Sequence, residues 1–248
     1  MELQGRIAVV TGGTTGIGRA SLQALEKEGA RVVNWDITDE ADVRVDVTKP
    51  EDIDAAIAWT VANVGVPTLL VTSAGVGYAV PFNEQTVESW NRVIDINLRG
   101  TFLSVQAVTR EMVKAKLDGS IVLIASINGI LADPQTLAYS VAKAGVIQMA
   151  KVVANEFGPD GIRVNAICPG PTETPMMAHH LENDTYRKTI ADSTALRAVG
   201  TAEQVAEVVV GTMKLDWITG QPILADGGAT LVTARGAARN ALNAFENP

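Results

Sequence analysis

The stretch TGGTTGIG, residues 11–18, directly follows the apolar run Ile7–Val10. Four of its last seven residues are glycine. This density of glycine weakens helix and strand alike, so it indicates a tight turn or a place where the backbone passes close to another group. Because residues 17–28 are compatible with a helix, the stretch is interpreted as the turn between a buried strand and a helix.

The rest of the chain repeats this alternation of strand and helix. Several runs rich in valine, isoleucine and leucine are apolar at successive positions, which is typical of parallel strands covered on both faces. We therefore predict an α/β fold, a single-domain, doubly wound (Rossmann-type) parallel sheet with helices on both faces, spanning residues 1–248. The predicted strands are Ile7–Thr11, Arg31–Trp35, Asp42–Val47, Thr68–Thr72, Ser120–Ala125, Ile162–Cys168 and Gln221–Leu224.

Local signals add detail to this outline. The segments 48–51 (TKPE) and 201–204 (TAEQ) have the spacing of a capping box and predict helix starts. The polar segment at about 176–200 interrupts the strand rhythm, as a substrate lid or a surface decoration does. The alanine-rich tail, about 234–248, fits either a short helix or a frayed end.

Composition limits the classes of partner. The chain is 47% hydrophobic with a net charge of −8, and its basic residues never cluster beyond two in a row. We therefore expect no nucleic-acid partner and no anionic membrane partner. No apolar stretch is long enough to span a bilayer and the start of the chain lacks a basic, cleavable leader, so we expect a cytoplasmic protein.

Cysteine and histidine are scarce. The single cysteine, Cys168, excludes an intrachain disulfide, and its place at the end of an apolar run favours a buried small hydrophobe over a reactive thiol. The only histidines, His179 and His180, lie in the polar segment without further ligands near them, which favours surface positions over a zinc site. We expect no metal centre.

The glycines of the first turn suit a nucleotide. Gly12 can allow the turn, Gly16 lets the backbone approach a pyrophosphate, and Gly18 permits close packing of the following helix. The helix N-terminus then offers amide groups and a positive dipole to phosphate.

Asp36 sharpens this interpretation. It ends the second predicted strand 18 residues after Gly18, where dinucleotide-binding folds place an acid that accepts hydrogen bonds from the adenosine ribose. Its carboxylate repels a 2′-phosphate, and Thr14, Thr15 and Ile37 carry no positive charge, so we predict NAD rather than NADP. The alternative is a solvated acid at a strand end.

A second group of residues suits proton transfer. Tyr139 and Lys143 lie four residues apart, on one face of a predicted helix. A phenol with a pKa near 10 is a poor acid or base until a nearby cation favours its ionised form. Ser126 ends the apolar strand before them, at the sheet edge where ligands bind, and can hydrogen-bond a substrate oxygen. Asn97 is a polar residue in an apolar helical stretch, for which a capping or packing amide is the alternative.

Taken together, these residues resemble the classical short-chain dehydrogenase/reductase family over nearly the whole chain. The resemblance rests on the order and spacing of TGGTTGIG, Asp36, Asp46-Val47, Asn97, Ser126, Tyr139, Lys143, Pro169-Gly170 with Thr174, Ile218-Thr219-Gly220 and Asp226-Gly227-Gly228. It implies hydride transfer between nicotinamide C4 and a carbinol or carbonyl carbon.

The resemblance also implies residue roles. Tyr139 would be the general acid/base, Ser126 would polarise the oxygen, Lys143 would lower the phenol pKa and bind the nicotinamide ribose, and Asn97 would hold a water in the proton relay. Asp46 and Val47 would contact adenine, and Thr174 with the preceding turn would fix the nicotinamide amide. The full cofactor set is Gly12, Thr14, Thr15, Gly16, Ile17, Gly18, Asp36, Asp46, Val47, Ser73, Ala74, Gly75, Tyr139, Lys143, Pro169, Gly170, Thr172 and Thr174.

The chain departs from the family pattern in two places beside the cofactor. The family's Asn-Asn-Ala-Gly is Thr72-Ser73-Ala74-Gly75 here, so that Ser73 keeps a hydrogen-bonding group in the cofactor loop but not the amide geometry. Asp46 follows Asp36 by only ten residues, so the usual helix between the second and third strands must be vestigial and the adenine side more open.

The substrate is expected to be a small to medium, mostly apolar secondary alcohol or ketone, because the predicted pocket has few polar anchors. Its predicted contacts are Ser126, Asn128, Tyr139, Met176 and Met177, with Val76, Tyr78, Ile127 and Leu137 nearby. A 3-oxoacyl thioester is the alternative substrate, and a non-catalytic nucleotide sensor is the other alternative. The helix after Tyr139 is apolar around most of its circumference, which predicts a homo-oligomer, a tetramer or a dimer.

Overall fold

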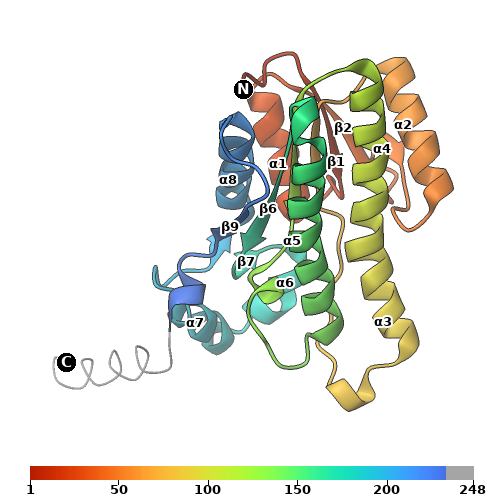
Figure 1. Ribbon diagram of the computed structural model, residues 1–248. Helices are drawn as coiled ribbons and strands as arrows, with labels where there is room; N and C mark the ends of the chain where they lie inside the picture. Colours follow the sequence, from red (N-terminus) through yellow and green to blue (C-terminus); the bar gives the residue numbers. More distant parts are fainter. Residues whose placement is uncertain (233–248) are drawn as a thin grey trace.

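The computed structural model describes residues 1–232, and a seven-stranded sheet runs through its centre (Figure 1). The strand order is β3-β2-β1-β4-β5-β6-β9, and every neighbouring pair is parallel. The order reverses between β1 and β4, which is where open α/β sheets bind ligands. The strands are β1 (Ile7–Thr11), β2 (Arg31–Asp36), β3 (Val43–Arg44), β4 (Leu69–Thr72), β5 (Gly119–Ile124), β6 (Ile162–Pro169) and β9 (Pro222–Ala225).

Helices cover both faces of the sheet, as the continuous apolar strands predict. α2 (Pro50–Asn63), α4 (Gly100–Ala115) and α5 (Leu137–Phe157) pack on one face, whereas α1 (Gly16–Lys27) and α8 (Ala202–Lys214) pack on the other. Every residue of β4 and β5 is buried between these layers. The predicted doubly wound architecture is therefore confirmed.

Six predicted strands agree with the structure to within one residue, and the third does not. The predicted strand Asp42–Val47 is reduced to the two residues of β3, which pair with Trp35 and Asp36. Val45 and Val47 are buried all the same, in the hydrophobic cluster that α2 covers. The apolar residues of this segment are therefore buried in a turn and do not form a longer paired strand. Between β2 and β3 the chain makes only turns and bends, in accord with the vestigial connection.

The two capping-box predictions had opposite outcomes. Thr201 and Gln204 form the complete box at the start of α8. At α2 the prediction was wrong, because Lys49 occupies the N-cap and the Thr48 hydroxyl donates instead to the carboxylate of Asp46 at 2.7 Å. A charged acceptor two residues away competes successfully for that hydroxyl.

Short elements gather at the edge where the strands end, which is the lower end of the molecule in Figure 1. The predicted lid, residues 176–200, contains most of α6 (Pro175–Leu181) and all of α7 (Asp184–Asp192). Its two ends are joined by a small parallel sheet of β7 (Thr172–Glu173) and β8 (Gly200–Thr201). The predicted tail, 234–248, lies outside the described residues. The other elements are α3 (Val87–Ile94), a π-helical turn (Asp95–Arg99) and 3₁₀ turns at Phe82–Glu84, Ile127–Gly129, Gly158–Asp160 and Ala229–Leu231.

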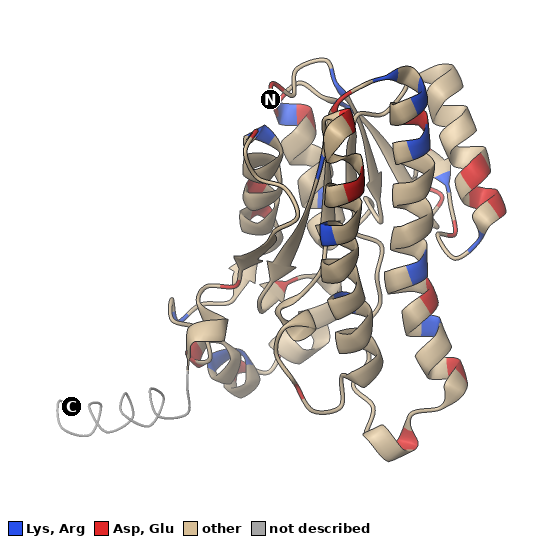
Figure 2. Ribbon diagram, in the orientation of Figure 1, with Lys and Arg blue, Asp and Glu red and all other residues tan. Residues whose placement is uncertain are grey.

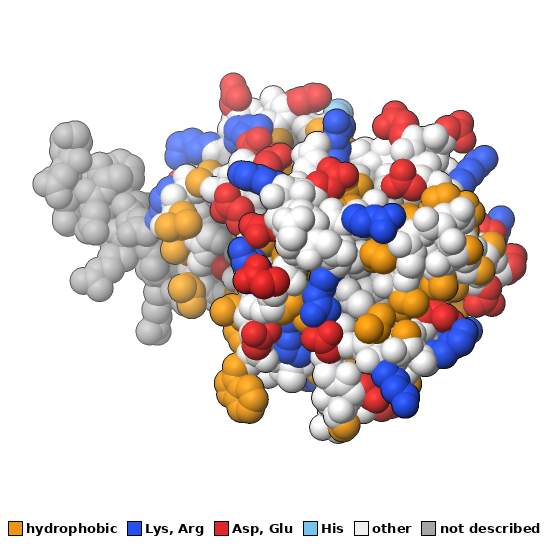
Figure 3. All heavy atoms as spheres, turned by 90° about the horizontal axis from the view of Figure 1, so that it is seen from above, with side chains coloured by type: hydrophobic (Ala, Val, Ile, Leu, Met, Phe, Trp, Pro, Cys, Tyr) orange, Lys and Arg blue, Asp and Glu red, His pale blue; other side chains and the backbone are white. Residues whose placement is uncertain are grey.

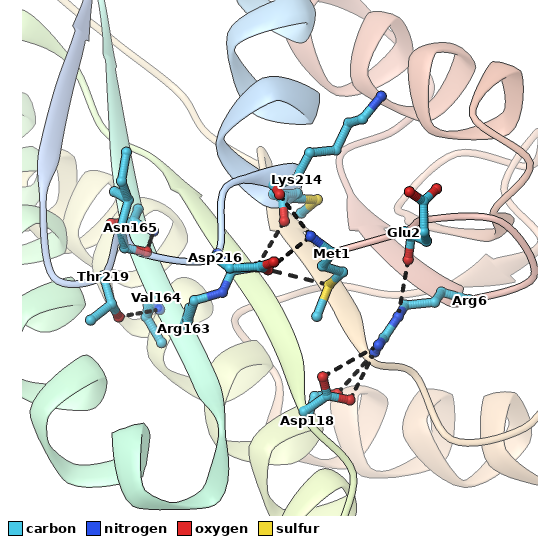
Figure 4. Close-up of polar contacts among 12 residues, drawn as sticks. Met1, Glu2, Arg6, Asp118, Arg163, Val164, Asn165, Lys214, Asp216 and Thr219 are labelled. Atoms are coloured by element: carbon cyan, nitrogen blue, oxygen red, sulfur yellow. Dashed lines mark hydrogen bonds and ion pairs between the residues drawn. The ribbon is translucent and has the colours of Figure 1, made fainter.

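The opposite edge, where the strands begin, is closed by polar contacts (Figure 4). Arg163 donates to the carbonyl of Met213 at the end of α8 at 2.8 Å, and Thr219 accepts the amide of Val164 at 3.1 Å. A cavity of about 460 Å³ lies beside these residues. Basic and acidic side chains are interspersed on this edge (Figure 3) and along the helices (Figure 2).

α5 with its following turn, Leu137–Asp160, is the only helix among the described residues that is long and apolar enough to cross a membrane by length and composition. In the fold it packs along β6, and its residues Val146 and Ala150 belong to the main hydrophobic cluster. These contacts are those of a core helix.

Candidate active site

The glycine-rich turn joins β1 to α1 and is too crowded for side chains at two positions. Gly12 has a φ of +68°, and a Cβ on it would lie 2.7 Å from the Cα of Ala74. A Cβ on Gly18 would lie 2.0 Å from the carbonyl oxygen of Gly12. The turn and the first helical turn therefore need glycine at both positions to reach this geometry.

The N-terminus of α1 is left open toward the sheet edge. Thr15 occupies the N-cap without a side-chain capping bond. No protein acceptor among the described residues bonds the amides of Ile17 and Gly18. Free amides at a helix N-terminus favour an anion, so this cradle fits the pyrophosphate of a dinucleotide.

Asp36 lies at the mouth of the same turn. Its Oδ2 accepts the amide of Thr14 at 3.0 Å and its Oδ1 accepts the amide of Ile37 at 2.7 Å. The Thr14 hydroxyl lies 2.9 Å from the hydroxyl of Thr38. This places a fixed carboxylate beside the glycine turn, where the adenosine ribose is expected.

Two residues near Asp36, Asn34 and Arg44, were not predicted as site residues from the sequence. Asn34 is buried, accepts the amide of Gly13 at 3.0 Å and donates to the Thr14 hydroxyl at 3.2 Å. An amide within an apolar strand was the available signal. Arg44 is the β3 partner of Asp36, which only the pairing register reveals, and its guanidinium bonds the carbonyl of Ile37 at 3.2 Å.

The predicted adenine contacts, Asp46 and Val47, follow β3. Asp46 accepts both the amide and the hydroxyl of Thr48, at 3.0 and 2.7 Å. Burial raises the pKa of Asp46, but these hydrogen bonds and the charge of Lys49 outweigh burial, so the pKa lies below its usual value. Val47 is buried against Gly100, where a Cβ would lie 2.7 Å from its side chain.

The Ser73-Ala74-Gly75 turn is held by a residue that the sequence analysis had not selected. The Thr11 hydroxyl accepts the amides of Ser73 and Ala74, at 3.2 and 3.3 Å. A Cβ on Gly75 would lie 2.6 Å from the amide oxygen of Asn97. These backbone contacts hold the loop although the family's second asparagine is replaced by serine.

The predicted nicotinamide segment, residues 169–174, lies across from the glycine-rich turn between β1 and α1. Pro169 ends β6, and a Cβ on Gly170 would lie 2.7 Å from the Cα of Asp226. The buried Thr172 donates to the carbonyl of Gly170 at 2.9 Å. Thr174 is the N-cap of α6, and its Cβ would lie 3.5 Å from a Cβ on Gly16. The two halves of the predicted cofactor site thus face each other.

Ser126, Tyr139 and Lys143 come together at the carboxyl end of β5. Lys143 donates to the carbonyl of Ile124, the last residue of β5, at 2.7 Å, and its Nζ lies 5.6 Å from the ring centroid of Tyr139. Ser126 caps the next 3₁₀ turn and accepts the amide of Asn128 at 3.1 Å. This is the constellation that the spacing predicted.

Burial sets the electrostatics of the cluster. It raises the pKa of the Tyr139 phenol, against the opposite effect of a hydrogen bond with Ser126. It lowers the pKa of Lys143 to about 8, against the opposite effect of the Cys168 side chain. Burial also raises the pKa of the Cys168 thiol to about 11. At neutral pH the lysine is therefore charged, and the phenol and thiol are protonated.

Asn97 lies in the π-helical turn between α3 and α4. Its Nδ2 donates to the carbonyls of Val76 and Val93 at 2.8 and 3.0 Å, and its Oδ1 accepts the amide of Val76 at 3.2 Å. The side chain thus matches the alternative interpretation of a packing amide, and it fixes the loop in front of Tyr139. The water-holding role stays a prediction.

The predicted substrate residues come from the 3₁₀ turn after Ser126, from α5 and from α6. A Cβ on Gly77 would lie 3.3 Å from the sulfur of Met176 and 3.5 Å from the Tyr139 ring, so both side chains adjoin Gly77. Asn128 contacts Ser126 through its backbone, and Met177 lies in the first turn of α6. Tyr78 is 46% exposed and accepts a hydrogen bond from Arg92 at 3.1 Å.

His179 and His180 lie at the end of α6, away from these side chains. His179 is exposed and its Nδ1 is 3.7 Å from Glu182. Among residues 1–232, no group of three or more histidine, cysteine, aspartate or glutamate side chains is placed to hold a metal ion.

A family model described as enoyl-(acyl carrier protein) reductase matches residues 12–230. This stretch contains the glycine turn, Asp36, Ser126, Tyr139 and Lys143. The chain belongs to the short-chain dehydrogenase/reductase family.

Individual relatives of this family cover nearly all of the chain. A 2,5-dichloro-2,5-cyclohexadiene-1,4-diol dehydrogenase of Sphingobium indicum is 32% identical over 93% of this chain and 99% of its own length. A 3-oxoacyl-acyl-carrier-protein reductase of Thermotoga maritima is 34% identical over 93% and 100%. The ligand-free aldohexose dehydrogenase of Thermoplasma acidophilum has a TM-score of 0.89, with 27% identity and coverage of 94% and 96%.

Membership of the short-chain dehydrogenase/reductase family makes the protein an oxidoreductase that acts on CH–OH or C=O groups with a nicotinamide cofactor. The three relatives are named for a cyclic diol, an acyl thioester and a sugar. The comparisons therefore give the reaction type and leave the substrate to the residues of this chain.

Proposed function

We propose that the protein is an NAD-dependent dehydrogenase/reductase of small to medium, mostly apolar secondary alcohols and ketones. The observation that carries the proposal is the cluster of Ser126, Tyr139 and Lys143 at the end of β5, at the same sheet edge as the open N-terminus of α1. One group of side chains suits proton transfer, and the other fits a dinucleotide.

The proposed mechanism follows from the hydrogen bonds in the cluster. In carbonyl reduction, the Tyr139 phenol, which is protonated at neutral pH, donates its proton to the substrate oxygen, and in alcohol oxidation the deprotonated Tyr139 accepts the hydroxyl proton. The Ser126 oxygen accepts the amide of Asn128, and its hydroxyl bonds Tyr139, so it would have to turn its proton from the phenol to the substrate oxygen to polarise it. The charge of Lys143 favours the phenolate. When bound, the nicotinamide takes up or supplies the hydride at its C4 carbon.

Asp36 supports the choice of NAD. Its carboxylate is held by the amides of Thr14 and Ile37, so it cannot swing away from the ribose position without losing two hydrogen bonds. A 2′-phosphate would meet this negative charge at close range. The nearest cation on the neighbouring strand, Arg44, is turned toward Ile37 and Asp39.

The side chains beside Tyr139 support an apolar substrate. Met176 and Tyr139 both adjoin Gly77, and the exposed Phe82, Ile130 and Leu131 belong to the loops at the same edge of the sheet. The relative from Thermotoga maritima makes a 3-oxoacyl thioester the second candidate substrate.

Two further parts of the proposal concern the molecule in solution. α5 exposes Val141 and Val152 and α4 exposes Phe102, on the same face of the sheet, which favours a homotetramer or homodimer built on this face. A cytoplasmic enzyme of this kind would act on a small molecule, with no nucleic-acid or membrane partner.

The test is the change in nicotinamide absorbance with NAD or NADP across a panel of secondary alcohols and, in reverse, ketones and a short 3-oxoacyl thioester. Turnover of an alcohol with NAD supports the proposal. Turnover of the thioester alone would favour the second candidate. Binding of NAD without turnover of any panel member would favour a nucleotide sensor.

A further inference from the structure

The lid helices are held to the rest of the molecule by very little hydrophobic packing. α7 has no buried residue, and Leu181 is the only buried residue of α6. A cavity of about 390 Å³ lies between the two helices and the nicotinamide segment, which all contribute to its lining. Its lining residues are Glu173, Thr174, Pro175, Ala178, Leu181, Glu182 and Arg187. With so little core, the position of the lid depends on a few polar contacts.

One side chain makes two of these contacts at once. Arg187 of α7 forms an ion pair with Glu173 through Nη1 and donates through Nε to the carbonyl of Leu181, the last residue of α6, at 3.2 Å. The planar guanidinium can hold two acceptors in fixed directions, which an ammonium cannot. A single residue therefore connects α7, α6 and β7.

The ion pair between Glu173 and Arg187 matters for the cofactor site because of the position of Glu173 in the chain. It lies between Thr172 and Thr174, the two threonines of the predicted nicotinamide segment. Successive strand residues point to opposite faces, so a hold on Glu173 fixes the direction of both threonines. A Cβ on Gly16 of the glycine turn would lie 3.5 Å from the Cβ of Thr174, so the two segments pack closely.

We propose that the Glu173–Arg187 pair is a clamp that positions Thr172 and Thr174 for the nicotinamide and sets the lid above them. Glu173 and Arg187 are positioning residues, because they act through the threonines. The proposal rests on the proposed function in one respect, that the segment 172–174 holds the nicotinamide end of the cofactor.

The test compares wild type with Glu173→Gln, Arg187→Met and Arg187→Lys. Lys188→Met is the matched control, because Lys188 also lies in α7 but pairs at 2.7 Å with Asp192 of the same helix. Two readouts are needed, the dissociation constant of NADH by fluorescence and hydrogen–deuterium exchange of residues 172–175 and α7.

We expect the Glu173 and Arg187 variants to weaken NADH binding roughly fivefold and to speed exchange in both segments, because the pair is half-exposed and its contribution modest. Lysine should not replace Arg187, since it cannot reach both acceptors. Lys188→Met should leave NADH binding unchanged. The double variant Glu173→Arg/Arg187→Glu should recover part of the affinity, because it restores the ion pair without the bond to Leu181.

Two results would overturn the clamp. If the Glu173 and Arg187 variants bind NADH with unchanged affinity, even with faster exchange in α7, the ion pair holds the lid but does not position the threonines for the cofactor. If NADH affinity falls equally in these variants and in Lys188→Met, the effect comes from the overall surface charge of α7 and not from the Glu173–Arg187 pair. Failure of the proposed function looks different, because wild-type protein would then bind neither NADH nor NADPH, which would overturn both proposals.

Discussion

The ammonium of Lys143 bonds the carbonyl of Ile124 at 2.7 Å while lying 5.6 Å from the ring centroid of Tyr139. The end of β5 thus anchors the lysine, and the lysine brings its charge to the phenol. Because the ammonium is almost fully buried, the same arrangement lowers its pKa to about 8. Catalysis and stability are therefore linked through one proton.

Tyr139→Phe should bind cofactor with wild-type affinity and lose at least ~100-fold in turnover, because the ring stays and the transferable proton is removed. The measurement is kcat for the best substrate of the panel together with the Kd for NADH. Tyr186→Phe, in the half-exposed part of α7, is the control. A Tyr139→Phe variant with more than a tenth of the wild-type rate would contradict the acid/base role.

The free energy of unfolding should rise by about 1 kcal/mol between pH 8 and 9. In this range the folded protein releases the Lys143 proton, near pH 8, whereas the unfolded chain keeps it until about 10.5, so stability increases with pH. Above pH 9 the unfolded chain loses the Cys168 proton that the folded protein keeps to about 11, which offsets the gain.

Urea unfolding across pH 7–10 measures this effect. Lys143→Met should abolish the rise, and Cys168→Ala should extend it beyond pH 9. A rise of the same size in the Lys143→Met variant would assign it to another group.

Asp36→Ala should lower the ratio of kcat/KM for NAD over NADP by at least ~10-fold, because it removes the negative charge that meets the 2′-phosphate and leaves Arg44 of the neighbouring strand as the cation that can attract it. Adding Arg44→Met to this variant should weaken the use of NADP again. Initial rates with both cofactors decide the question. An unchanged ratio in Asp36→Ala would place the discrimination elsewhere.

Lys116→Gly should stabilise the protein by roughly 0.5–1 kcal/mol. Lys116 caps the end of α4 in the left-handed region, with a φ of +55°, where glycine is free of Cβ strain. Lys114→Gly is the control, since it places glycine inside the same helix and should cost about 1 kcal/mol. Thermal unfolding of the two variants should therefore shift in opposite directions.

The sequence predicted the parts of the structure that depend on local pattern. Continuous apolar runs located six strands to within one residue, since burial on both faces leaves little choice of residue there. The i to i+4 spacing of Tyr139 and Lys143, with Ser126 at a strand end, was enough to bring these side chains together, because β5 ends and α5 begins at the same sheet edge.

What depends on contacts between distant segments could not be predicted. Thr11 holds the amides of Ser73 and Ala74 across more than sixty positions of sequence, and Arg44 neighbours Asp36 only through strand pairing. The Thr48 capping box failed because a nearby carboxylate competed for the hydroxyl. The contact of Arg187 with Glu173 likewise exists only once the lid has folded back.

The small sheet of β7 and β8 brings the two ends of the lid side by side, with Thr172 paired to Gly200 and Glu173 to Thr201. Because the two ends of this segment are paired with each other, the residues between them can vary with little effect on the positions of the ends. We therefore expect changes in this segment that keep Thr174 and Arg187 to leave the path of β6 and α8 unaltered. In the proposed function this segment supplies the substrate contacts Met176 and Met177, so these contacts could change while the end of β5, with Ser126, Tyr139 and Lys143, stays as it is.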